Sequence, residues 1–150
     1  MRILIPLYAV VFIGVACAAP IPKKLRSKFN TDIDTLQGRW LQTARSFKGQ
    51  AIVPAPASDD SYILFDGDTI TVCHGNKKGF DRCTFVLDDT TTPKQLRVTM
   101  PGGGAYNFAY SLDDKVLLKL TDALYDKSII PTAVEPSVDT FYVEYRKQSK

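Results

Sequence analysis

The sequence is poor in the residues on which most catalytic and metal sites depend. Of its 150 residues, one is histidine, three are cysteine and one is tryptophan. It contains no C-x-x-C pair, and His74 is the only base available to a serine–histidine–acid triad. Gly102-Gly103-Gly104 is not followed by a helix pattern, so it does not predict a phosphate-binding loop. We therefore expect no enzyme, no cofactor and no metal site.

Adjacent aspartates occur at Asp59-Asp60, Asp88-Asp89 and Asp113-Asp114. Such pairs can act in general acid/base catalysis or bind calcium. These pairs lie at predicted turns, where aspartate is favoured by its bonds to the local backbone, and no Asp-x-Asp-x-Asp-Gly loop surrounds them. We interpret them as turn residues.

Long hydrophobic runs are absent except at the amino terminus. Ile3 to Val15 form an apolar run, and Ala16-Cys17-Ala18 offers a small-x-small cleavage site. The run is too short to cross a bilayer core, which needs about 20 apolar residues. We predict that residues 1–18 are a signal peptide and that the protein is exported, to the periplasm or the extracellular space. Lipidation at Cys17 is a less favoured alternative, because the preceding residues match a bacterial lipobox only in part.

Charge is divided unevenly along the chain. Residues 19–33 form a proline-containing leader, and its first part, Ala19 to Asn30, has four basic residues and no acidic one. From Thr31 onward 16 acidic residues outnumber 14 basic ones, so the net charge of +3 belongs to the amino-terminal segments. A basic segment can contact anionic lipid or nucleic acid. Since the rest of the chain has no basic, aromatic-interleaved surface, we predict a solvated linker and no nucleic-acid partner.

Removal of the signal peptide would leave two cysteines, Cys73 and Cys83. An even number of cysteines in an exported protein favours a disulfide. The turn sequence Gly75-Asn76-Lys77-Lys78-Gly79 would place the two opposite each other on a hairpin. The alternative is a redox or metal pair with His74. We predict the disulfide, with a stabilisation of about 2.8 kcal/mol in the chain-entropy model.

Residues 34–150 have the periodicity of strands, and only Ile33 to Gln37 suggests a short helical turn. Asp66-Gly67 is a strong signal for a two-residue hairpin turn. The connections are short, so we predict an all-β fold, an eight-stranded up-and-down antiparallel β-barrel. The predicted strands are Trp40–Lys48, Ser61–Asp66, Asp68–Cys73, Gly79–Leu87, Lys94–Thr99, Gly104–Leu112, Lys115–Leu120 and Asp139–Lys147.

Most of these strands alternate apolar and polar residues, as one buried face requires. The first strand departs from this pattern, because Gln42, Ala44 and Ser46 point inward if Trp40 does. Small and polar residues there would either leave room for a ligand or make space for aromatic side chains from other strands. Under the first interpretation the candidate lining residues are Gln42, Ala44, Ser46, Tyr106, Phe108, Tyr110 and Tyr145.

Leu36-Gln37-Gly38-Arg39-Trp40 opens the first strand with a glycine two residues before the only tryptophan. With Phe65-Asp66-Gly67-Asp68, Tyr110-Ser111-Leu112-Asp113 and a final Arg146-Lys147, it resembles the small lipocalin-like domain of exported planctomycete proteins. The resemblance runs from Leu36 to Lys147 and implies a calycin-type barrel. It also implies that a basic residue of the last strand packs on Trp40 and closes the barrel. That residue would be Arg146, or Lys147 if the register differs.

The chain departs from that pattern at Ile130-Pro131-Thr132-Ala133, where such domains often have Arg-Pro-x-x-Phe. The irregular segment Thr121 to Val138 would fold over one mouth of the barrel or pack outside its wall. A second one, Gly49 to Asp60, would form the other rim of an opening. We expect an exported, monomeric, non-enzymatic barrel that binds a small apolar or amphiphilic ligand. The alternative is a protein-interaction or inhibitor module in which a filled barrel is the scaffold.

Overall fold

The computed structural model describes residues 31–55, 61–73 and 82–149. The predicted signal peptide and the turn at residues 75–79 lie outside these ranges, as does most of the leader. The described part contains one helix and nine strands. They are α1 (Thr31–Leu36), β1 (Gly38–Phe47), β2 (Val53–Pro54), β3 (Tyr62–Asp66), β4 (Thr69–Cys73), β5 (Cys83–Asp88), β6 (Lys94–Thr99), β7 (Ala105–Asp113), β8 (Leu117–Ala123) and β9 (Thr140–Lys147).

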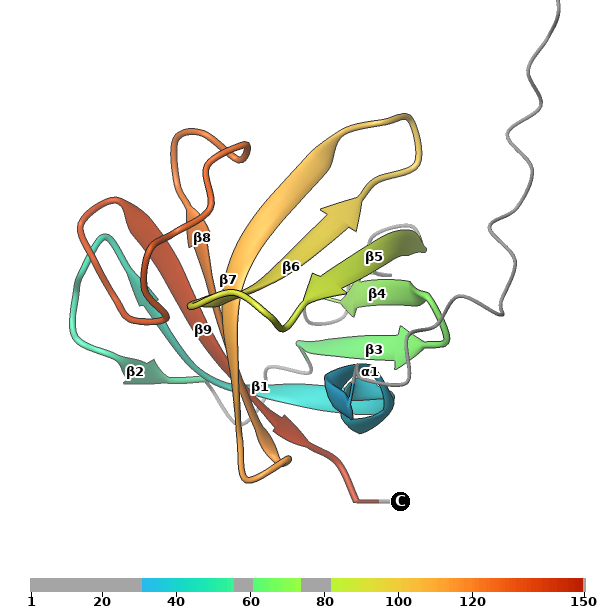
Figure 1. Ribbon diagram of the computed structural model, residues 1–150. Coiled ribbons are helices and arrows are strands. Elements are labelled where there is room, and N and C mark those ends of the chain that lie inside the picture. The colour runs from blue at the N-terminus through green and yellow to red at the C-terminus, as the bar shows by residue number, and fades with distance from the viewer. Residues whose placement is uncertain (1–30, 56–60, 74–81, 150) are drawn as a thin grey trace, which may run out of the picture.

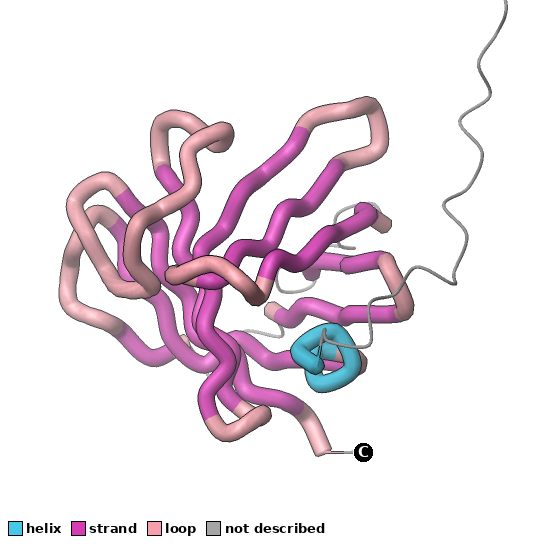
Figure 2. Tube along the Cα trace, viewed as in Figure 1, coloured by secondary structure: helices cyan, strands magenta, loops and turns pink. Residues whose placement is uncertain are grey.

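The strands form a closed antiparallel barrel (Figures 1 and 2). From β3 to β9 each strand pairs with the next one in sequence, and β1 pairs with both β3 and β9. The predicted eight-stranded up-and-down barrel is therefore confirmed, and its eight strands are β1 and β3 to β9. β2 was not predicted; it is a two-residue addition that pairs with the second half of β1, at Ala44 and Arg45.

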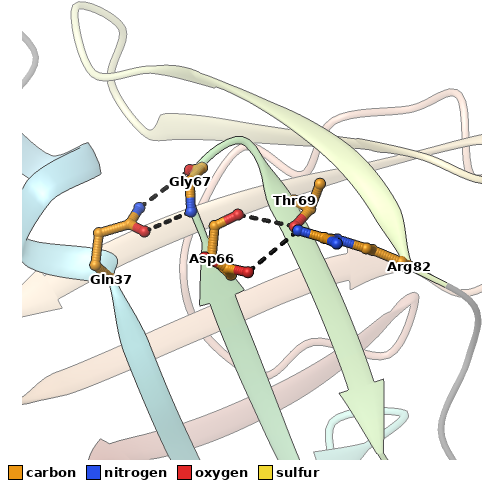
Figure 3. A network of polar contacts seen from close by, with 5 residues as sticks. All are labelled: Gln37, Asp66, Gly67, Thr69 and Arg82. Carbon is orange, nitrogen blue, oxygen red and sulfur yellow. Dashed lines mark hydrogen bonds and ion pairs between the residues drawn. The ribbon is translucent and has the colours of Figure 1, made fainter.

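The β3–β4 hairpin has the two-residue turn that Asp66-Gly67 predicted. Gly67 follows Asp66 with φ of 62°, a backbone conformation that glycine adopts without strain. The Gln37 side chain holds this turn through two bonds: it donates to the Gly67 carbonyl (3.2 Å) and accepts from the Gly67 amide (2.8 Å). Figure 3 shows this link between the end of α1 and the hairpin. The nearby Arg82–Asp66 ion pair is exposed, so it adds little to stability.

The two ends of the barrel differ. α1 lies against one end, beside the start of β1 (Figure 1). Leu36 is completely buried there, and Ile33 packs against the hydrophobic core. We call this the closed end. At the opposite end lie the long connections after β1 and β8, and we call this the mouth.

The prediction that Ala44 and Ser46 point inward is wrong. The register between β1 and β9 shifts between Gln42 and Ala44, which marks a β-bulge. Before the bulge Gln42 pairs with Tyr145, whose side chain lines the interior. After it Ala44 pairs with Glu144, which points outward between two inward neighbours. Ala44 and Ser46 are therefore buried on the outer face of the wall.

The predicted disulfide is also absent, because the two cysteines face opposite sides of the wall. Cys83 pairs with Ile70, and both line the interior. Cys73 follows Val72, which also lines the interior, so its side chain points outward. Three residues along β4 also span about 10 Å, beyond the roughly 7 Å between Cα atoms that a disulfide tolerates. Both residues are thiols, and the Cys83 Sγ donates to the Met100 Sδ at 3.3 Å.

Candidate functional site

The closed end is sealed around Trp40, which is completely buried. Its indole Nε1 donates to the Leu36 carbonyl at 2.7 Å, so α1 supplies the polar partner that a buried indole needs. Lys147 pairs with Trp40 across β1 and β9 and places its Nζ 5.3 Å from the ring centroid. The same ammonium donates to the Thr35 carbonyl.

The closing cation is therefore Lys147, and the first choice from the sequence, Arg146, is wrong. Arg146 pairs with Leu41, so it lies one position out of phase with the tryptophan and its side chain is exposed. The alternation of a strand allows only every second residue to reach the interior. Gly38 precedes this arrangement with φ of 107°, which explains why glycine stands two residues before the tryptophan.

A second polar cluster at the closed end joins α1 to the wall. The Asp32 carboxylate accepts from Lys94 Nζ (2.6 Å) and from the Tyr110 hydroxyl (3.0 Å). Burial, followed by the charge of Asp32, strongly raises the pKa of Tyr110. Tyr110 was a candidate lining residue, but its hydroxyl is hydrogen-bonded to Asp32 of α1.

Between the closed end and the mouth the barrel contains a partly open cavity of about 220 Å³. A single buried water needs only about 10–15 Å³, so the space has room for a small ligand. Its walls come from seven strands and the β6–β7 turn, and only one of the lining residues is charged. They are Ile63, Ile70, Val72, Cys83, Leu96, Val98, Met100, Tyr106, Phe108, Leu120, Asp122, Phe141, Val143 and Tyr145.

Some of the residues proposed from the sequence line the cavity, and others do not. Tyr106, Phe108 and Tyr145 are among the lining residues. Gln42 points inward but is not among them, and its buried Nε2 has no hydrogen-bond partner in the described part of the chain. The space therefore lies toward β3 to β9 and away from the second half of β1.

Sequence reasoning missed Asp122, the one charged residue of the cavity. It continues the inward row of β8 after Leu118 and Leu120, and it pairs with the inward residues Phe108 and Phe141. An acidic residue on an otherwise apolar inward face is the sequence signal that would have revealed it. The predicted seventh strand ended at Leu120, two residues too early to show this.

The Asp122 side chain is only 8% exposed, and Lys127 Nζ lies 2.5 Å from its Oδ2. Its Oδ1 is buried without a hydrogen-bond partner among the described residues, an arrangement that costs about 1–3 kcal/mol. Burial raises the pKa of Asp122, and the ammonium of Lys127 opposes this rise, with a smaller contribution from the residue's own backbone amide.

Lys127 comes from the connection between β8 and β9, which was predicted to cover a mouth or to pack outside the wall. Asn107, on the outer face of β7, holds this connection. Its backbone amide donates to the Lys127 carbonyl (3.2 Å), and its side chain donates to the carbonyls of Lys127 and Ser128 (both 3.1 Å). The connection therefore passes from the rim onto the outer wall, with Lys127 reaching back to Asp122.

Several large apolar side chains are exposed on the connections after β1 and β8. They are Ile52 and Val53 after β1, and Tyr125, Ile129 and Val138 after β8. Phe47, at the end of β1, contacts Phe141 of the cavity wall edge to face, with ring centroids 6.4 Å apart. The two connections that start at the mouth therefore carry exposed apolar side chains.

Two further hollows, of about 560 and 480 Å³, lie outside the barrel. The first involves α1 and the β7–β8 turn, and five of its six lining residues are polar or charged. The second lies on the outer face of β5 to β7 beside Ile130. Neither is enclosed by the strands, so the interior cavity is the better candidate site.

No group of three or more histidine, cysteine or acidic side chains that could hold a metal ion is found among residues 31–55, 61–73 and 82–149. In the same ranges no helix is long and apolar enough to cross a membrane. No protein-family model, curated protein or solved structure matches the chain.

Proposed function

We propose that this protein binds a small apolar or amphiphilic molecule inside the barrel. The observation that carries the proposal is the apolar cavity of about 220 Å³ beneath the mouth, at the end opposite the Trp40 seal. Apolar lining with a single polar group is typical of ligand pockets. The tryptophan covered by a basic residue of the last strand supports a lipocalin-like relationship, and we keep the expectation that the protein is exported, monomeric and not an enzyme.

The proposal is tested with protein purified without detergent. Native mass spectrometry should reveal a co-purifying small molecule, and N-phenyl-1-naphthylamine, a neutral apolar fluorophore, should become bright on binding. Trp40 is a poor reporter, because it lies under Lys147 and does not line the cavity. The proposal would be contradicted if no bound molecule were found and the fluorescence showed no saturable increase.

A second candidate function, a protein-interaction module, is favoured by the exposed apolar side chains of the β8–β9 connection. Tyr125 is 73% exposed and Ile129 is 55% exposed on the same connection. Exposed apolar patches mark binding surfaces when they are contiguous. Replacement of both residues by serine separates the two candidates: it would abolish a protein interaction made by this connection and leave binding of the fluorophore unchanged.

A further inference from the structure

Asp122 is poorly placed for stability. Its carboxylate is buried in an apolar wall, it has one cationic partner at Oδ2, and its Oδ1 has no partner among the described residues. A leucine at this position would match the inward neighbours Leu118 and Leu120. A buried polar group that the fold itself does not satisfy, at the edge of a cavity, is typical of a site that a ligand completes.

We propose that Asp122 recognises an uncharged hydrogen-bond donor, a hydroxyl or an amide N–H, at the end of an apolar ligand in the barrel. This inference rests on the proposed function, because it assigns the headgroup of a molecule held in the same cavity. The ligand class would include long-chain alcohols, monoacylglycerols and similar neutral amphiphiles.

The position of Asp122 in β8 sets the orientation of such a ligand. It is the penultimate residue of the strand, at the mouth, and its cross-strand partners Phe108 and Phe141 also line the cavity. A headgroup at Asp122 leaves the tail to run toward Ile70 and Leu96. The carboxylate torsion is broad, so a small rotation can direct Oδ1 toward a donor while Oδ2 keeps Lys127.

The charges at the site argue for a neutral headgroup. A ligand carboxylate would face the Asp122 carboxylate in an apolar environment, where like charges repel strongly. A ligand ammonium would meet the Lys127 ammonium, which is already 2.5 Å from Oδ2. A hydroxyl or amide donor satisfies Oδ1 and avoids both conflicts.

Calorimetric titration of the wild-type protein at neutral pH with 1-decanol, decanoate, decylamine and decane tests the inference. The four probes share a ten-carbon chain and differ in the headgroup. We expect 1-decanol to bind about tenfold more tightly than decanoate and decylamine, a difference of about 1.4 kcal/mol. Equal binding of all four, or tightest binding of a charged probe, would overturn the headgroup assignment but leave the proposed function standing. Failure of every probe to bind would count against the proposed function itself.

Asp122→Asn is the matching variant, because it removes the charge and keeps the shape of the side chain. It should reduce the preference for 1-decanol over decanoate to about twofold, since an amide also donates to a carboxylate. Asp139→Asn removes an exposed carboxylate just before β9 and should leave the tenfold preference intact. The same preference in wild type and Asp122→Asn would assign discrimination to another residue and overturn the inference. The ranking measured on the wild type decides the matter even if the variant folds poorly.

Discussion

The closed end and the mouth of this barrel are built on opposite principles. At the closed end the polar groups around Trp40 and Tyr110 have partners: the Trp40 indole bonds to Leu36, Lys147 bonds to Thr35, and Asp32 joins Lys94 and Tyr110. At the mouth a carboxylate oxygen of Asp122 lacks a partner in the described residues, and apolar side chains are exposed on the connections that start there.

This difference assigns stability to one end and recognition to the other. Dense packing with satisfied polar groups stabilises a fold, whereas a cavity forfeits contacts and an unsatisfied acceptor costs free energy. Substitutions at the closed end should therefore change unfolding more than ligand binding. Substitutions around the cavity should do the reverse.

The largest expected effect is that of Trp40→Ala. Truncation of a completely buried aromatic side chain should lower the free energy of unfolding by about 3–5 kcal/mol. Urea unfolding followed by circular dichroism measures it. Val86→Ala, on the exposed outer face of β5, is the control and should change the free energy by less than about 0.5 kcal/mol. Similar losses in the two variants would show that Trp40 is not the seal.

A smaller effect separates Lys147 from its neighbour Arg146. Lys147→Met removes the cation over Trp40 and the bond to Thr35, and it should cost about 1–2 kcal/mol of unfolding free energy. Arg146→Met removes an exposed side chain and should cost less than about 0.5 kcal/mol. Urea unfolding of both variants checks the pair. A larger loss for Arg146→Met would mean that the register of β9 is shifted by one residue.

The sequence predicted the closed end well, because that end follows local and periodic rules. Gly38 and Trp40 marked the first strand, Asp66-Gly67 marked a hairpin, and alternation within the strands located most inward faces. The choice between Arg146 and Lys147 required the pairing register of β9 with β1. That register is set by contacts between residues about a hundred positions apart, which a single sequence does not reveal.

The mouth was predicted less well, because irregular features control it. A bulge after Gln42 reversed the faces of Ala44 and Ser46, and no period-two pattern reports a bulge in advance. Cys73 and Cys83 were paired on the assumption of a symmetrical hairpin, whereas Cys83 pairs with Ile70. Asp122 was overlooked because β8 was ended too early. These errors fall around the candidate site, where the fold departs from regular rules.

Filling of the cavity should affect binding without loss of stability. Val72 lines the cavity near the mouth end of β4, and Val72→Phe would occupy part of the space. We expect the free energy of unfolding to rise by about 0.5–1 kcal/mol, as for other cavity-filling changes. Binding of N-phenyl-1-naphthylamine should weaken at least about tenfold, or 1.4 kcal/mol. Val86→Phe adds the same ring to the outer face and should leave binding unchanged; equal binding by both variants would place the ligand elsewhere.

The smallest expected effect is a pH dependence that comes from Asp122. Burial raises the pKa of this carboxyl above its ordinary value of 3.8, so the folded protein holds the proton more tightly than the unfolded chain. The contribution of this group to stability is therefore fully present below pH 3.8 and is lost as the pH rises through the folded-state pKa. The wild-type protein should lose free energy of unfolding relative to Asp122→Asn as the pH rises from about 4 to 7.

Asp126 gives a control of opposite sign. Bonds from the Ser128 hydroxyl and amide lower the pKa of Asp126, so its contribution is present above pH 3.8 and is lost as the pH falls. Urea unfolding of wild type, Asp122→Asn and Asp126→Asn from about pH 2 to 7 tests both signs. A flat difference between wild type and Asp122→Asn would mean that Lys127 fully compensates the buried charge, and the mouth would then be as well satisfied as the closed end.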